Sequence, residues 1–119
     1  NTTMRLLSFR VGPQDSGAEM YVVKLAAGQF GNWQDNVNRW RREAGLEPLD
    51  DVSSVKPASV QIGQNEAQLF DFTGPARQEL VGYLVRGQWA WFFKLRGPAE
   101  VVAGQKAPFL DFLKSVQFE

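Results

Sequence analysis

Residues 78–95 read QELVGYLVRGQWAWFFKL, two apolar runs that meet at Gly87. Successive strand residues point to opposite faces, so the first run has apolar groups on both: Leu80 and Leu84 on one, and Val81, Tyr83 and Val85 on the other. The second run divides in the same way: Trp89, Trp91, Phe93 and Leu95 on one face, and Ala90 and Phe92 on the other. A strand that is apolar on both faces needs cover on both. The stretch therefore predicts two central strands of a sheet enclosed by two helices, or by a helix and a loop layer.

Further strands are predicted on the N-terminal side of this stretch. Residues 59–62 and 66–73 are β-rich and are followed by short turns, a pattern typical of an antiparallel meander. Residues 4–11 and 19–25 are predicted to form a hairpin around the loop 12–17. These segments extend the same antiparallel sheet.

Two helical regions are predicted to cover the sheet. In residues 33–44 one stripe of the helix carries Trp33, Val37, Trp40 and Ala44. We expect Asn32 to cap this helix and Gly45 to end it. Near the C-terminus we expect a short helical turn at 99–103 and a second one that begins at Pro108, because proline suits the first position of a helix.

Composition excludes several chemistries. The chain has 119 residues, no His and no Cys, which removes His-based and Cys-based nucleophile pairs, Cys/His zinc sites and thiol redox chemistry. Its 13 Lys and Arg balance 13 Asp and Glu, which argues against nucleic acid as a partner. No apolar run approaches the roughly 20 residues of a membrane span. We expect one α+β domain over residues 1–119, with no catalytic activity and no cofactor.

Three stretches carry a family resemblance. The aromatic strand Trp89–Leu95 ends at Gly97-Pro98, the chain closes on residues 109–118 with the pattern F-x-x-F-L-x-S-x-x-F, and residues 36–41 read NVNRWR. With the order of elements, they resemble the PsbP/Mog1-like fold family and its uncharacterised bacterial members. The resemblance implies an α/β/α sandwich, an antiparallel sheet with helices on both faces. Family members include accessory proteins of photosystem II and a protein that binds the GTPase Ran, so it also implies a non-enzymatic protein-binding module.

The first residue and the resemblance together suggest a compartment. The chain begins with Asn1 rather than Met, so we expect either an excised domain or a product of a longer precursor whose signal or lipid-attachment segment has been removed. An extracytoplasmic location, periplasmic or lipid-anchored, is therefore expected, with the cytoplasm as the alternative.

Charged residues of the first helix and of the loop after it form the candidate partner-binding surface. On the helix, Asn38, Arg39 and Arg42 are expected to face outward, opposite the apolar stripe. The loop 47–56 carries the only dense group of acids, Glu47, Asp50 and Asp51, without the spacing of a calcium loop. Asn36, at the border of the stripe, is expected to tie the helix to a neighbouring loop carbonyl.

Three functions are consistent with these features. The first is a non-catalytic interaction or accessory module of an exported bacterial protein. The second is a small-ligand binder with a cleft between the first helix, the loop 46–58 and the sheet. The third is a carboxylate-dependent hydrolase, which requires two acids facing one cavity. Asp71 is the acid to inspect, with Arg86 or Lys94 as its expected partner if it is buried.

Overall fold

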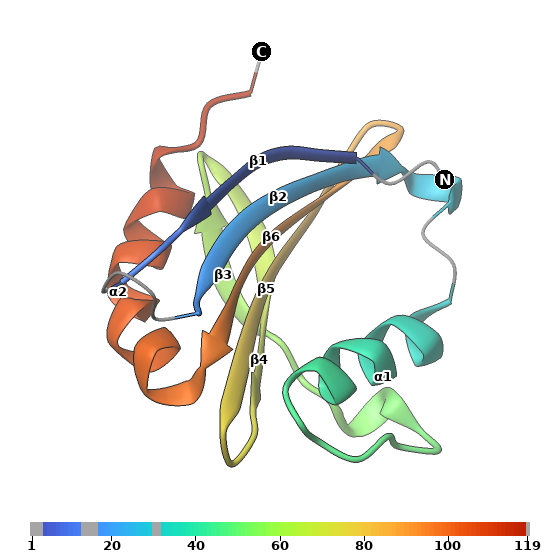
Figure 1. The fold of residues 1–119 in the computed structure, drawn as a ribbon. Coiled ribbons are helices and arrows are strands. Elements are labelled where there is room, and N and C mark those ends of the chain that lie inside the picture. Colours follow the sequence, from blue (N-terminus) through green and yellow to red (C-terminus); the bar gives the residue numbers. More distant parts are fainter. Residues whose placement is uncertain (1–3, 13–16, 30–31, 119) are drawn as a thin grey trace.

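A computed structural model describes residues 4–12, 17–29 and 32–118. Six strands form one antiparallel sheet in the order β1-β2-β6-β5-β4-β3 (Figure 1). Their bounds are β1 Met4–Arg10, β2 Glu19–Ala26, β3 Ala58–Ile62, β4 Asn65–Thr73, β5 Arg77–Arg86 and β6 Trp89–Pro98. With the helices α1 (Trp33–Glu43) and α2 (Ala99–Ser115), this confirms the predicted α+β class and antiparallel sheet.

The strands connect as the turn residues predict. β3 to β6 form the meander, and the β1–β2 hairpin joins it because β2 pairs with β6 along its whole length. Residues 13–16 of the predicted hairpin loop lie outside the described residues. The two runs of residues 78–95 are therefore the two inner strands β5 and β6.

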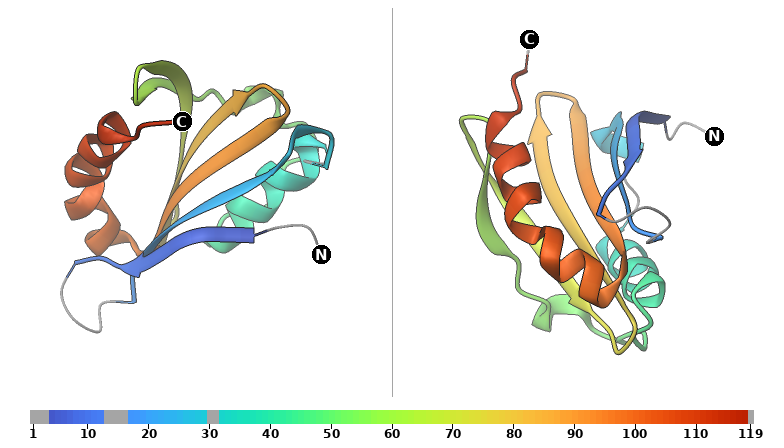
Figure 2. Two further views of the ribbon diagram at one scale, coloured as in Figure 1. Left: turned by 90° about the horizontal axis from the view of Figure 1, so that it is seen from above. Right: turned by 60° about the vertical axis from the view of Figure 1, so that its left-hand side comes forward.

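Side chains on the two faces of β5 and β6 belong to two separate core clusters. One cluster joins α2 to the sheet and contains Leu80, Leu84, Phe93, Leu95, Val102, Phe109 and Leu113. The other joins α1 to the sheet and contains Val37, Trp40, Phe70, Phe72, Val81 and Phe92. The alternation read from the sequence divides most of the strand residues between these clusters as predicted. Val85 and Trp89 differ, because they flank the β5–β6 turn, are each 45% exposed and belong to neither cluster. Figure 2 shows α2 running along the sheet at a distance from α1.

The C-terminal helix differs from the prediction. A single helix spans Ala99–Ser115 and contains Pro108, whereas two short helical turns were expected. Proline removes the hydrogen bond to the carbonyl four residues earlier, which belongs to Gly104. Both Gly104 and Pro108 are exposed, so water can solvate that carbonyl and the helix continues past the proline.

The ends and the buried stripe of α1 follow the prediction in most details. Asn32 caps the helix, its Oδ1 accepting from the Asp35 N–H at 2.8 Å, and Gly45 follows the helix with a φ of 82°. Trp40 is fully buried. Trp33 differs, because 37% of its surface is exposed at the rim of the same cluster.

The C-terminal end of α1 closely approaches the turn between β4 and β5. A Cβ added to Gly74 would lie 1.9 Å from the Ala44 carbonyl oxygen, so a side chain there would displace the helix end. Glycine at this turn therefore permits α1 to reach the sheet.

Candidate functional site

A groove lies between α1, the loop 46–58 and the sheet, where the sequence predicts a cleft. Its volume is about 380 Å³. The lining residues are Trp33, Val37, Asp51, Val52, Ser53, Val55, Pro57, Gln68 and Phe70. A short 3-10 helix, η2 (Val52–Ser54), interrupts the predicted loop, and Asp51 caps it by accepting from the Ser53 N–H at 2.9 Å.

Side chains of α1 hold the first part of this loop in place. Asn38 donates to the Leu49 carbonyl and accepts from the Leu49 N–H, both at 2.8 Å. Gln34 also donates to the Leu49 carbonyl, and the Arg41 Nε donates to the Glu47 carbonyl at 2.8 Å. The loop is therefore positioned before any partner arrives.

These contacts correct two sequence interpretations. Asn38 is 8% exposed and does not face outward, because the loop folds back over its side of the helix. It ties helix to loop, the role expected of Asn36. Asn36 instead donates to the Asn32 carbonyl within the helix start. A helical wheel shows how far a residue lies from the apolar stripe, but not where the following loop will run.

The other five residues of the candidate partner-binding surface are exposed: Arg39, Arg42, Glu47, Asp50 and Asp51. Of these, only Asp51 lines the groove. At about 100° per residue, Arg39 and Arg42 lie roughly 160° and 140° around α1 from Val37, which is a lining residue. The structure therefore separates the helix cations from the groove.

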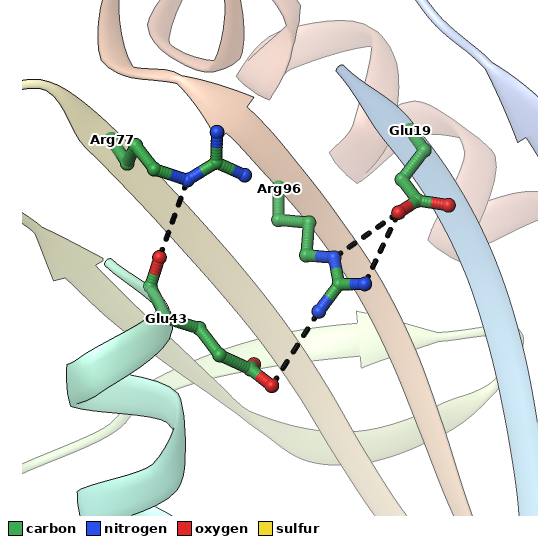
Figure 3. Close-up of polar contacts among 4 residues, drawn as sticks. All are labelled: Glu19, Glu43, Arg77 and Arg96. Atoms are coloured by element: carbon green, nitrogen blue, oxygen red, sulfur yellow. Dashed lines mark hydrogen bonds and ion pairs between the residues drawn. The ribbon is translucent and has the colours of Figure 1, made fainter. Parts of the chain in front are cut away.

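A group of charged side chains, most of them partly buried, lies between the last turn of α1 and the strands β2, β5 and β6 (Figure 3). Arg96 bridges two carboxylates, Glu19 at 3.2 Å and Glu43 at 3.5 Å. Arg77 donates to the Glu43 carbonyl at 3.3 Å. Glu79 on β5 lies opposite Arg96 on β6 in the strand register and is 0% exposed.

Glu79 and Glu43 form a carboxyl pair. Burial, followed by the neighbouring Glu43 carboxyl, raises the pKa of Glu79 from 4.5 to about 8, against the opposing charges of Lys94 and Arg96. Among the described residues, both Glu79 oxygens and Glu43 Oε1 are buried and receive no hydrogen bond from a donor, an environment that favours the neutral form of Glu79. The neighbouring Lys94 is also buried, and burial lowers the pKa of its ammonium.

The sequence interpretation missed the pair of Glu43 and Glu79, although the alternation along the strands contains a signal for it. Glu79 is in phase with Val81 and Tyr83, and Lys94 is in phase with Phe92, so both charges fall on an apolar face of an inner strand. Opposite charges on apolar faces of adjacent strands indicate a buried polar cluster.

Asp71, the acid chosen for inspection, is exposed. Its Oδ1 accepts from Thr73 and Gln78 at 2.7 and 3.0 Å, and its Oδ2 lies 3.4 Å from the Lys106 Nζ. These partners differ from Arg86 and Lys94, which the sequence suggested. Asp71 therefore belongs to a surface network.

Two further hollows are present. An open one of about 580 Å³ lies over β3, β4 and β5, and an apolar one of about 180 Å³ lies between β2, β6 and α2. Neither Glu43 nor Glu79 lines these hollows or the α1 groove.

Within the described ranges no group of three acids is placed to hold a metal. Neither described helix is both long and apolar enough to cross a membrane.

No family model matches the chain, and no protein of curated function matches it either. A structural comparison finds a crystal structure of a Pseudomonas aeruginosa protein of unknown function, described as a putative regulator. The two chains are 12% identical with a TM-score of 0.49, over 98% of this chain and 81% of the other.

Proposed function

We propose that the chain is a non-catalytic protein-binding module whose partner occupies the groove between α1, the loop 46–58 and the sheet. The observation that carries the proposal is the positioned loop, which is fixed to α1 through Asn38, Gln34 and Arg41. A loop ordered in advance loses little conformational entropy on binding. Trp33, half-exposed on the groove wall, is a residue type enriched where protein interfaces gain most of their energy.

The proposal extends to fold family and compartment. We assign the chain to the PsbP/Mog1-like α/β/α sandwich, an assignment supported by the two core clusters, one with α1 and one with α2. The same resemblance supports an accessory role in an exported bacterial protein and an extracytoplasmic location.

A small-ligand binder is the second candidate. Its support is the groove itself, since about 380 Å³ falls in the range of ligand pockets and three polar side chains accompany the apolar lining. The hydrolase candidate has the least support, because Glu43 and Glu79 line none of the three hollows described above.

Photo-crosslinking in cells of the source bacterium tests the proposal. A benzophenone amino acid replaces Ser53, which lines the groove, or the control residue Ser54, which is also exposed but does not line it. We expect one discrete protein adduct from position 53 and none from position 54. Equal labelling from both positions, or none from either, would contradict the proposed binding surface.

A further inference from the structure

The charge of the groove lining has one sign. Among the nine lining residues, Asp51 is the only ionisable acid and there is no Lys or Arg. The loop 46–58 adds two exposed acids at Glu47 and Asp50 against one cation at Lys56. Arg39 and Arg42 lie on the far side of α1, and the Arg39 guanidinium is 5.9 Å from the Trp40 ring. A charge complementary to this groove is positive.

The walls of the groove have the chemistry of a site for a long cationic side chain. Val37, Val52, Val55 and Pro57 present aliphatic surface. Trp33 presents an aromatic ring that packs against Phe70, with the ring centroids 5.4 Å apart. Cations are attracted to the faces of such rings, while alkyl stems pack against aliphatic walls.

The acid of the groove is fixed in position. Asp51 accepts from the backbone N–H of Ser53 at 2.9 Å at the start of η2. This hydrogen bond lowers the pKa of the Asp51 carboxyl, so the charge is present at neutral pH. A fixed carboxylate in a groove whose lining also includes an indole ring is suited to an ammonium or a guanidinium group.

We propose that the groove receives a lysine or arginine side chain of the partner protein, whose alkyl stem packs on the valines and whose cation pairs with Asp51 and the Trp33 ring. This inference rests on the proposed function. It specifies the chemistry that the partner must present, namely a basic side chain on an exposed segment.

Solution NMR of the intact chain tests the inference with four capped amino acids as probes. Nα-acetyl methylamides of lysine and arginine are compared with those of norleucine and glutamate, and the signals followed are the Trp33 indole and the Val37, Val52 and Val55 methyls. We expect saturable shifts from lysine and arginine and about three- to fivefold weaker binding of norleucine, the ratio of an exposed charge pair plus a cation–π contact. Glutamate is expected to produce no shift.

Two pairs of variants identify the residues responsible for the preference for lysine over norleucine. Asp51→Asn keeps an acceptor for the Ser53 N–H and is expected to reduce the preference for lysine over norleucine, while Asp50→Asn leaves it unchanged. Trp33→Leu is expected to reduce the preference, while Trp89→Leu, at a tryptophan 45% exposed outside the groove, does not.

The outcomes separate this inference from the proposed function. Equal binding of lysine and norleucine, an equal effect of Asp50→Asn and Asp51→Asn, or no shift from any probe at about 20 mM would overturn the cation site. The Ser53 crosslink tests the binding surface independently, so a positive crosslink with no cation preference would leave the module in place and remove only this inference.

Discussion

Replacing Glu79 with Gln should make the stability of the fold less dependent on pH. The folded pKa of Glu79 is raised from 4.5 to about 8, so between these two pH values the folded chain holds a proton that the unfolded chain has released. A raised carboxyl pKa therefore lowers stability as pH rises through this window. The charged groups facing Glu79 are Glu43 on α1 and Lys94 and Arg96 on β6.

The expected size follows from the shift. Each pH unit within the window costs the folded state about 1.4 kcal/mol, so this one group removes roughly 3 kcal/mol of stability between pH 5 and pH 7. That is a large part of the roughly 5–15 kcal/mol that holds a domain of this kind together. Glutamine is nearly the same size as glutamic acid and has no titratable proton, so Glu79→Gln removes the dependence without opening a cavity.

Urea unfolding followed by tryptophan fluorescence at pH 5, 6 and 7 measures the effect as a difference. The stability of Glu79→Gln minus that of the wild type should grow by roughly 3 kcal/mol across this range. Glu100→Gln, at an exposed acid in the first turn of α2, is the control, and its profile should run parallel to that of the wild type. A Glu79→Gln difference that stays constant within about 0.5 kcal/mol, the scatter of surface substitutions, would refute the raised pKa of Glu79.

Three other substitutions test the packing. Trp40→Ala should lose about 3–5 kcal/mol in the same urea assay, because the ring is fully buried among Phe70, Phe72 and Phe92; a loss no larger than surface scatter would mean that the ring does not fill the core. Asn38→Ala should lose roughly 2 kcal/mol for its two hydrogen bonds to Leu49 and should speed hydrogen exchange at the Leu49 amide. An unchanged exchange rate would argue against these two hydrogen bonds. Pro108→Ala should gain roughly 1–2 kcal/mol, because the new N–H completes the α2 ladder while some unfolded-state entropy is regained; a loss of stability would show that the proline is needed where it is.

The sheet was predictable because alternation along a strand is a local signal. Leu80 and Leu84 against Val81 and Tyr83 already define two buried faces, and the structure assigns each set to a different cluster. Caps are equally local, which is why Asn32 and Gly45 were predicted correctly. Pro108 misled because its local preference for a helix start is outweighed by the packing of Phe109 and Leu113 on the same helix.

The candidate site depended on contacts between distant residues and was predicted less completely. A cleft beside the loop 46–58 was predicted, but the hydrogen bonds that position the loop were not, since nothing near Asn38 in the sequence indicates that Leu49 folds back to it. The carboxyl pair of Glu43 and Glu79 joins residues 36 positions apart, and only the approach of α1 to β5 brings them together.

The most direct test of the central claim is the affinity for the partner identified by the Ser53 crosslink, measured by calorimetry with the purified proteins. Ser53→Trp places a large side chain in the groove, whereas Ser54→Trp adds the same side chain one residue away, outside the lining. We expect Ser53→Trp to weaken binding by about tenfold or more, corresponding to about 1.4 kcal/mol, and Ser54→Trp to have no effect. Equal affinities for the two variants would contradict the assignment of the groove as the binding surface.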